Sequence, residues 1–315
     1  MKTISFGIFV AAASLVCALP LHAAFINGQN YVSLADWARG NGFHVALLNR
    51  EIILTHENSR LVFDVNSADA EINGVDVRLS FPVAKGALVS QLDLDKTIRP
   101  LLFPARYIKP KKITTICLDP GHGGKDTGNR VGWHNEKTYT LYLAFDVRDE
   151  LKKAGFKVIF TRTKDVYVGL PERPAHANKH GADLFVSLHF NATTTGKNEV
   201  EGPETYCITP VGAASSNAQG EGSDHGATTA NRCENQSLLL AYQMEKSLVQ
   251  NLHAEDRGVR RARFAVLRDA EMPAILIEGG YMTNPGEGKK IYSVAYRKQM
   301  AAAIVKGILA YQKLT

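Results

Sequence analysis

The C-terminal two thirds of the chain alternate short apolar runs with segments of helical periodicity. The apolar stripe of Leu143, Ala144, Val147 and Leu151 predicts a helix from Asn135 to Ala154 that Gly155 ends. Alternating strands and helices predict an α/β fold with a mostly parallel sheet covered by helices on both faces. Further strands are expected over residues 114–118, 158–161, 184–188, 204–208 and 274–277, and further helices around residues 236–252 and 300–308.

Residues 25–104 have a different pattern, in which short β-type runs are separated by turns. Asn27-Gly28 and Asn73-Gly74 are typical of tight turns, and a short helix is expected over residues 34–39. This predicts a small α+β or β-rich domain, followed by a linker (residues 105–112) and the α/β domain (residues 113–312). The stretch INGQNYVSLADWARGNGFHV resembles the copper-amine-oxidase N-terminal-like module, as does EING at residues 71–74. The resemblance implies a stalk or wall-binding role.

The longest apolar run, residues 4–19, lies at the N-terminus of the chain. Lys2 precedes the run and Leu21-His22-Ala23 follows it, so we predict a signal peptide over residues 1–23. A cut after Ala18 and an uncleaved anchor are the alternatives. No other run approaches the roughly 20 residues of a membrane span. We therefore expect an exported protein, periplasmic or extracellular at the cell wall, with no membrane span after signal removal.

The composition, 315 residues of which 45% are hydrophobic and 22% charged, is that of a globular protein. The net charge of +6 suits an anionic cell envelope, and the sequence carries no nucleic-acid-binding motif. Removal of the signal leaves Cys117, Cys207 and Cys233. In an oxidising compartment we predict a Cys207–Cys233 disulfide at the base of loop 211–232, which would overhang the catalytic cleft. Separate reduced thiols are the alternative.

The candidate chemistry gathers where predicted strands end. His122 follows the strand at residues 114–118, His189 ends the next buried strand, and Glu278 closes the apolar run 274–277. Glu136 stands in the first turn of the helix after His122. Because ligands bind beyond the carboxyl ends of such strands, these side chains can meet there. Two imidazoles and one carboxylate make a catalytic zinc site, and a second carboxylate can act as general base.

A phosphate-binding loop is a rival interpretation of the same segment. Gly124-Lys125 fits that motif, but Asp126 stands where it needs Ser or Thr, and Asp119 replaces its first glycine. This rival is therefore excluded.

Four separated motifs, residues 116–128, 136–137, 187–192 and 273–284, together resemble the zinc-dependent N-acetylmuramoyl-L-alanine amidases of the amidase-3 type. The resemblance covers residues 113–311. It implies that His122, Glu136 and His189 bind Zn²⁺ and that Glu278 is the catalytic glutamate. It also implies hydrolysis of the amide between N-acetylmuramic acid and L-alanine, with peptidoglycan as partner. Activation by another protein, not identified by the sequence, stays open. Asn129 and Gly280 depart from the family pattern at positions that affect substrate fit.

Three other functions stay open at this point. The first is a zinc peptidase that cuts within the peptidoglycan stem peptide, and the second is a catalytically silent wall-binding or activator protein. The third is an adhesin whose main functional unit is the N-terminal segment. The presence of all four candidate residues, His122, Glu136, His189 and Glu278, favours an enzyme over the two binding proteins.

Overall fold

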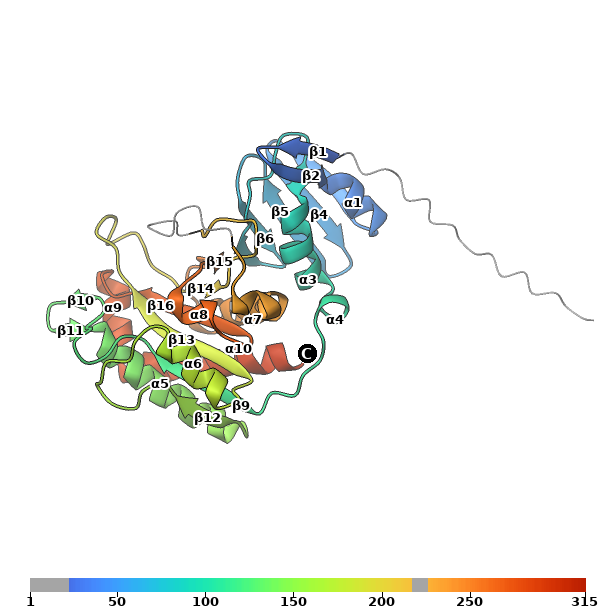
Figure 1. Cartoon of the computed structure of the whole chain (residues 1–315). Helices are drawn as coiled ribbons and strands as arrows, with labels where there is room; N and C mark the ends of the chain where they lie inside the picture. Colours follow the sequence, from blue (N-terminus) through green and yellow to red (C-terminus); the bar gives the residue numbers. More distant parts are fainter. Residues whose placement is uncertain (1–22, 217–225) are drawn as a thin grey trace, which may run out of the picture.

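The computed structural model describes residues 23–216 and 226–315 (Figure 1). The predicted signal peptide lies outside these residues except for Ala23, which begins the first strand, β1 (Ala23–Ile26). Within the described ranges, no helix has the length and apolar character needed to cross a membrane.

A parallel group of strands forms the centre of the catalytic region. Its order is β12 (Lys157–Phe160), β9 (Thr115–Pro120), β13 (Leu184–Asn191) and β16 (Ala274–Tyr281). These are the predicted strands, each shifted by a residue or extended at its carboxyl end. Every residue of β9 is buried, as expected for a parallel strand with both faces covered.

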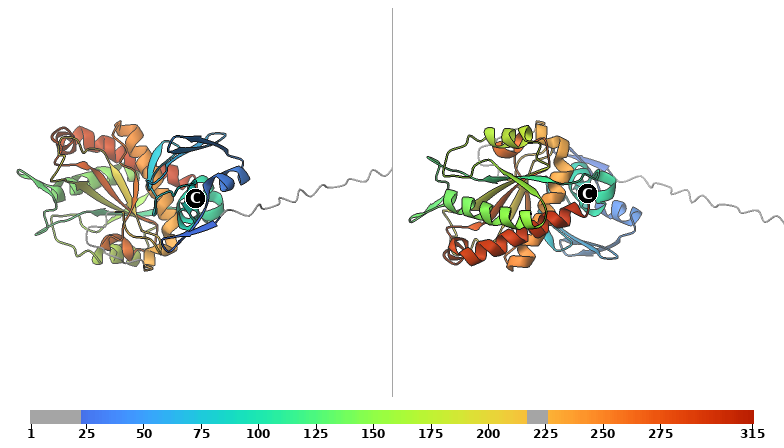
Figure 2. Two further views of the ribbon diagram at one scale, coloured as in Figure 1. Left: turned by 90° about the horizontal axis from the view of Figure 1, so that it is seen from above. Right: turned by 90° about the horizontal axis from the view of Figure 1, so that it is seen from below.

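Helices cover both faces of this group (Figure 2). On one face, α5 (Glu136–Lys153), α7 (Glu234–Leu252) and α10 (Val294–Gln312) pack against one hydrophobic core cluster. On the other face, α6 (Glu172–Lys179) and α8 (Ala265–Arg268) pack over a second, smaller cluster. The predicted helix from Asn135 to Ala154 is confirmed as α5, with Asn135 as its N-cap and Ala154 as its C-cap.

The prediction of a mostly parallel sheet is wrong, because the eleven-stranded sheet is mixed. Strand β14 (Glu204–Cys207) runs antiparallel to β16, and β15 (Val259–Arg261) runs parallel to β14. Beyond β15 the sheet continues into the N-terminal region through β7, β6, β5, β4 and β3, which are antiparallel to one another. Tight turns such as Asn73-Gly74, with left-handed φ at both residues, permit only antiparallel neighbours.

The N-terminal region thus shares a sheet with the catalytic region, through the pairing of Val77 in β7 with Val259 in β15. A separate three-stranded sheet, β1-β2-β8, packs beside it with α1, the predicted short helix. Residues 108–114 connect this region to β9 without regular structure. The division into domains at residues 104 and 113 stays a prediction.

The remaining elements of the N-terminal region have these bounds: β2 (Gln29–Ser33), α1 (Leu34–Gly40), β3 (His44–Leu48), β4 (Glu51–His56), β5 (Ser59–Asp64), β6 (Asp69–Ile72), β7 (Val75–Arg78), β8 (Leu88–Ser90), α2 (Gln91–Asp93), a π-helical turn (Leu94–Ile98), α3 (Arg99–Leu102) and α4 (Pro104–Tyr107).

The predicted disulfide is also wrong, since Cys207 and Cys233 are both free. Cys207 is fully buried in β14, and its thiol lies 3.7 Å from the carbonyl oxygen of Arg260. Cys233 caps α7, and its thiol lies 3.6 Å from the carbonyl oxygen of Glu271. Each sulfur therefore packs in its own environment. Residues 217–225 of the proposed overhanging loop lie outside the described residues.

Candidate active site

His122 stands in a tight loop at the carboxyl end of β9. Its φ of 60° lies in the left-handed region, which is uncommon for a residue with a side chain. The buried Arg173 holds this loop, because its guanidinium donates to the carbonyl oxygen of His122 at 2.9 Å and pairs with Asp119 at 2.8 Å. The sequence motif placed His122 correctly, and the structure shows what stabilises its conformation.

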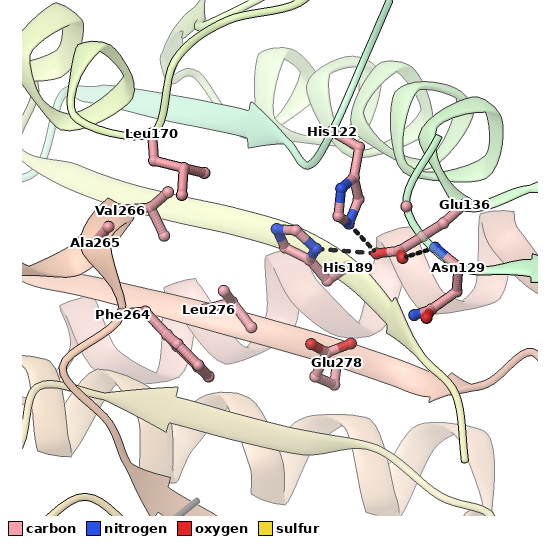
Figure 3. A pocket seen from close by; sticks show the side chains of 11 residues that line it. His122, Asn129, Glu136, Leu170, His189, Phe264, Ala265, Val266, Leu276 and Glu278 are labelled. Carbon is pink, nitrogen blue, oxygen red and sulfur yellow. Dashed lines mark hydrogen bonds and ion pairs between the residues drawn. The ribbon is translucent and has the colours of Figure 1, made fainter. Parts of the chain in front are cut away.

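Three of the four predicted side chains converge on one point (Figure 3). His122 Nε2 lies 3.0 Å and His189 Nδ1 lies 2.9 Å from the same oxygen, Oε1 of Glu136. One donor atom from each residue lies within 4.8 Å of the other two, and no second group of this kind occurs in the described part of the chain. The prediction that these side chains come together is therefore confirmed in space.

Glycines allow this close approach. A Cβ atom at Gly121 would lie 2.2 Å from the ring of His189, and one at Gly128 would lie 2.5 Å from His122 and 2.6 Å from Glu136. No larger residue fits at either position without moving the cluster.

A second layer of hydrogen bonds fixes the three side chains. Asp126 bonds to His122 Nδ1 at 2.9 Å and leaves Nε2 facing Glu136. Backbone N–H groups of Asn129 and Phe190 donate to the Glu136 carboxylate. Burial acts to raise the pKa of Glu136, but its hydrogen bonds with His122 and His189 outweigh burial and hold that pKa well below its ordinary value.

No role was predicted for Asp126 from the sequence, where its presence served only to exclude a phosphate-binding loop. Its signal was its spacing, four residues after the strand-end His122 in a glycine-rich loop. Asn129, which departs from the family pattern, bonds through its side chain to the carbonyl oxygen of Phe190 at 2.9 Å and lines the cavity.

Glu278 completes the set from the neighbouring strand. It stands in register opposite His189 on β13, and Figure 3 shows its carboxylate turned toward the cluster. Its Oε2 is buried and accepts no hydrogen bond from the described residues. Burial raises the pKa of this carboxyl well above its ordinary value, and the negative charges of Glu136 and Glu204 add to that effect. The carboxylate is thus near the cluster without being part of it.

These side chains border a cavity of about 340 Å³ with two unlike ends. The polar end holds the cluster, Glu278 and Asn129. The other end is apolar and is formed by Leu170, Phe264, Ala265, Val266 and Leu276. This wall was not predicted from the sequence, because most of its residues lie in or beside short segments that show no hydrophobic periodicity.

Comparisons with known proteins agree with this arrangement. The family model of N-acetylmuramoyl-L-alanine amidase (Amidase_3) matches residues 116–310. The chain is 33% identical over 236 residues to N-acetylmuramoyl-L-alanine amidase AmiA of Salmonella typhimurium, covering 65% of this chain and 80% of that protein. It is 34% identical over 207 residues to the uncharacterized protein YqiI of Bacillus subtilis, covering 66% of this chain and 89% of that protein.

Solved structures show the same likeness. An N-acetylmuramoyl-L-alanine amidase from Clostridium difficile 630 has 33% identity and a TM-score of 0.54, covering 64% of this chain and 98% of that one. The amidase AmiC2 of Nostoc punctiforme has 32% identity and the same TM-score, covering 65% and 99%. The family match spans more than half of the chain and includes all five residues of the cavity's polar end. The chain therefore belongs to the N-acetylmuramoyl-L-alanine amidase family and is a hydrolase of amide bonds in peptidoglycan.

Proposed function

We propose that the chain hydrolyses the amide between N-acetylmuramic acid and L-alanine with a zinc ion held by His122, Glu136 and His189, and with Glu278 as general base. One observation carries this proposal. Two imidazoles and one carboxylate converge beside a second carboxylate, that of Glu278, and one oxygen of this second carboxylate is buried and has no hydrogen-bond partner among the described residues. An unpaired buried carboxylate is costly, so its presence points to a functional role.

The donor set fits zinc better than magnesium or calcium. Zinc binds two histidines and one carboxylate in hydrolases and keeps a fourth position open, whereas magnesium and calcium prefer oxygen ligands alone. The hydrogen bond that the Asp126 carboxylate accepts from Nδ1 of His122 is the kind of support that metal-bound histidines commonly have. The cavity beside the cluster leaves one side open to substrate.

The remaining chemistry follows from the side chains present. A bound zinc ion would lower the pKa of water from about 15.7 to roughly 7 and polarise the scissile carbonyl. Glu278 lies on the strand beside His189 and can accept a proton from the attacking water as its oxygen bonds to the carbonyl carbon. The same carboxyl then gives that proton to the amide nitrogen as the carbon–nitrogen bond breaks, and the amine of L-alanine leaves.

Digestion of purified peptidoglycan tests this function. We expect soluble products with a free L-alanine amine and an intact lactyl carboxylate, identified by mass spectrometry, and we expect a chelator to stop their release until zinc is added back. Product ends inside the stem peptide would indicate the zinc peptidase instead. Digestion that continues unchanged after the chelator has removed all metal would contradict the metal-based mechanism.

We further propose that residues 1–23 direct export and that residues 25–104 bind the wall. The only group of potential metal ligands in the described residues lies in the catalytic region, so the N-terminal region has no comparable chemistry. An inactive Glu278→Gln protein should sediment with intact sacculi, and the isolated segment 25–104 should do so as well. Sedimentation of the full chain but not of the folded segment would place wall binding in the catalytic region.

A further inference from the structure

We propose that Trp133 forms a saccharide-binding platform that holds sugar rings of the glycan strand next to the metal cluster. The inference rests on the proposed function, because it concerns the sugar side of the same amide. Trp133 is 77% exposed, the most exposed of the large hydrophobic side chains in the described residues. Isolated exposed apolar residues are common, so exposure alone does not indicate a binding site; the packing and the position of the Trp133 ring do.

The backbone places Trp133 at the tip of a hairpin. Strands β10 (Arg130–Val131) and β11 (His134–Asn135) are antiparallel, and Val131 pairs with His134. Gly132 and Trp133 are therefore the two turn residues. Gly132 has a φ of 60°, as the first position of a tight hairpin turn requires. Figure 1 shows this hairpin at the edge of the molecule beside α9 (Pro285–Tyr292).

Two further rings hold the indole in a stack. The ring centroids of Trp133 and His134 lie 3.6 Å apart, and His134 lies 3.6 Å from Tyr292 with its plane only 6° away from parallel. The hydroxyl of Tyr139 on α5 bonds to Nδ1 of His134 and fixes the middle ring. The indole thus has one face on His134 and a large remaining exposure. Because its orientation is already set, a ligand that binds the free face orders few additional bonds.

The hairpin continues directly from the active-site cavity. Asn129, which lines the cavity, precedes one strand, and Glu136 follows the other. Trp133 stands three residues before Glu136, so their Cα atoms lie within roughly 11 Å of each other. That length is comparable to two linked sugar rings. Trp133 is not among the residues that line the cavity, so we expect contact with the indole only from a glycan long enough to extend beyond the cavity.

The apolar wall of the cavity and the exposed ring of Trp133 suit different halves of the substrate. The scissile amide joins a sugar to an amino acid, so these halves leave the cluster in different directions. The apolar wall of Leu170, Phe264 and Val266 suits the methyl group of L-alanine and the residues after it. The exposed ring of Trp133, which lies outside the cavity lining, suits a pyranose, whose C–H groups pack on an aromatic face while its hydroxyl groups stay in water. We therefore assign the glycan to the Trp133 end.

A binding experiment without peptide or catalysis tests the platform. The probe is the β-1,4-linked tetramer of N-acetylglucosamine, and the signal is tryptophan fluorescence, since the second tryptophan, Trp37, is buried in the N-terminal region. We expect a saturable change in the wild-type protein and at least a roughly ten-fold loss of affinity in Trp133→Ala, measured by calorimetry. Trp133→Tyr should retain most of the affinity, and Tyr107→Ala, which removes an exposed ring on α4, should retain all of it. Equal binding by Trp133→Ala would overturn the proposal.

A kinetic experiment distinguishes binding from support of Glu136. On glycan strands that carry stem peptides, Trp133→Ala should raise KM roughly ten-fold and leave kcat within about two-fold. On a lactyl-peptide without sugar, the same variant should match the wild type. An equal loss on both substrates would mean that Trp133 only supports the metal ligand. If the tetramer binds but peptidoglycan is not cut, the proposed function is wrong and the saccharide platform is supported. If peptidoglycan is cut but the tetramer does not bind, the platform is wrong and the proposed function is supported.

Discussion

Two glutamates stand opposite each other on neighbouring strands and show how differently one sheet can use a carboxylate. Glu204 on β14 is in register with Glu278 on β16. Glu204 pairs with Arg260 at 2.7 Å through one oxygen, and its other oxygen accepts a hydrogen bond from Asn191 at 2.6 Å. Glu278 has a buried oxygen that accepts no hydrogen bond from the described residues. The first carboxylate has partners for both oxygens, whereas the second has one oxygen without a hydrogen bond, as the proposed role of a general base requires.

Carboxylates near Glu204 and carboxylates near Glu278 also differ in their partners. Arg260 also borders a cavity of about 250 Å³ where β7 meets β15, with Asp69, Asp76, Arg78 and Asp256 around it. There the carboxylates meet arginines, which stay protonated and cannot bind a metal. At the cluster, Glu136 meets two imidazoles, which can. The partner of the carboxylate, rather than the density of acidic residues, distinguishes the junction of β7 with β15 from the cluster of His122, Glu136 and His189.

The largest expected effect is loss of the metal cluster. Replacing His122 or His189 by alanine removes one of three donor side chains, so we expect the purified protein to lose bound metal and its amidase activity to fall to background. Metal content by mass spectrometry and digestion of peptidoglycan check this. His176→Ala, which removes a histidine outside the cluster, is the matched control. Full metal retention in both cluster variants would show that the ligands lie elsewhere.

The next effect separates Glu278 from the ligands. Glu278→Gln keeps the shape of the side chain but cannot accept a proton, so kcat should fall by roughly 10²- to 10⁴-fold with metal content unchanged. Loss of the metal in this variant would instead make Glu278 a ligand.

Glu204→Gln provides the opposite half of this comparison. It should retain metal but lower the free energy of unfolding by about 1–3 kcal/mol, because it removes the charge that pairs with Arg260 and leaves that guanidinium without its partner. Urea unfolding of both variants measures the difference. Equal stability of the Glu204 and Glu278 variants would remove the distinction between the two carboxylates.

A smaller effect is expected at Asp126. Asp126→Ala leaves the three ligands but removes the group that orients His122, and changes of this kind lower metal affinity by roughly 10- to 100-fold. Titration against a competing chelator measures the affinity. Asp126→Asn, which can still accept a hydrogen bond from Nδ1, should lie between the wild type and Asp126→Ala. Affinity equal to wild type in both variants would mean that the glycine-rich loop alone positions His122.

The sequence located the four polar residues because parallel strands bring their carboxyl ends to one edge, whatever the remaining strands do. It could not give the direction of β14, since a short apolar run such as residues 204–208 pairs equally well in either direction. It also could not reveal the joint of β7 with β15, which depends on one pairing between residues 182 positions apart in the chain (259 − 77). The failure of the Cys207–Cys233 prediction has a similar cause, because sequence spacing does not report the direction in which each sulfur points.

The smallest expected effect concerns pH and the joint of β7 with β15. Partial burial, followed by the negative charges of Asp256 and Glu71, raises the pKa of Asp76 to about 6, while Arg260 opposes the rise. Asp76 therefore holds its proton more tightly in the folded protein than in the unfolded chain. Its contribution to stability is full below about pH 4 and is lost as the pH rises toward 6.

Asp76→Asn removes this loss without touching the active site. Relative to wild type, the variant should gain stability between about pH 4 and 6 and stay about 1 kcal/mol more stable at pH 7, a modest value because solvent screens this site. Urea unfolding at pH 4.5 and pH 7 measures the difference, and amidase activity at pH 7 should not change. A variant that is less stable than wild type at pH 7 would show that the Asp76 carboxylate stabilises the joint rather than straining it. The acidic groups at the junction of β7 with β15 and at the cluster would then both be favourable as anions, and the contrast between them would rest on metal binding alone.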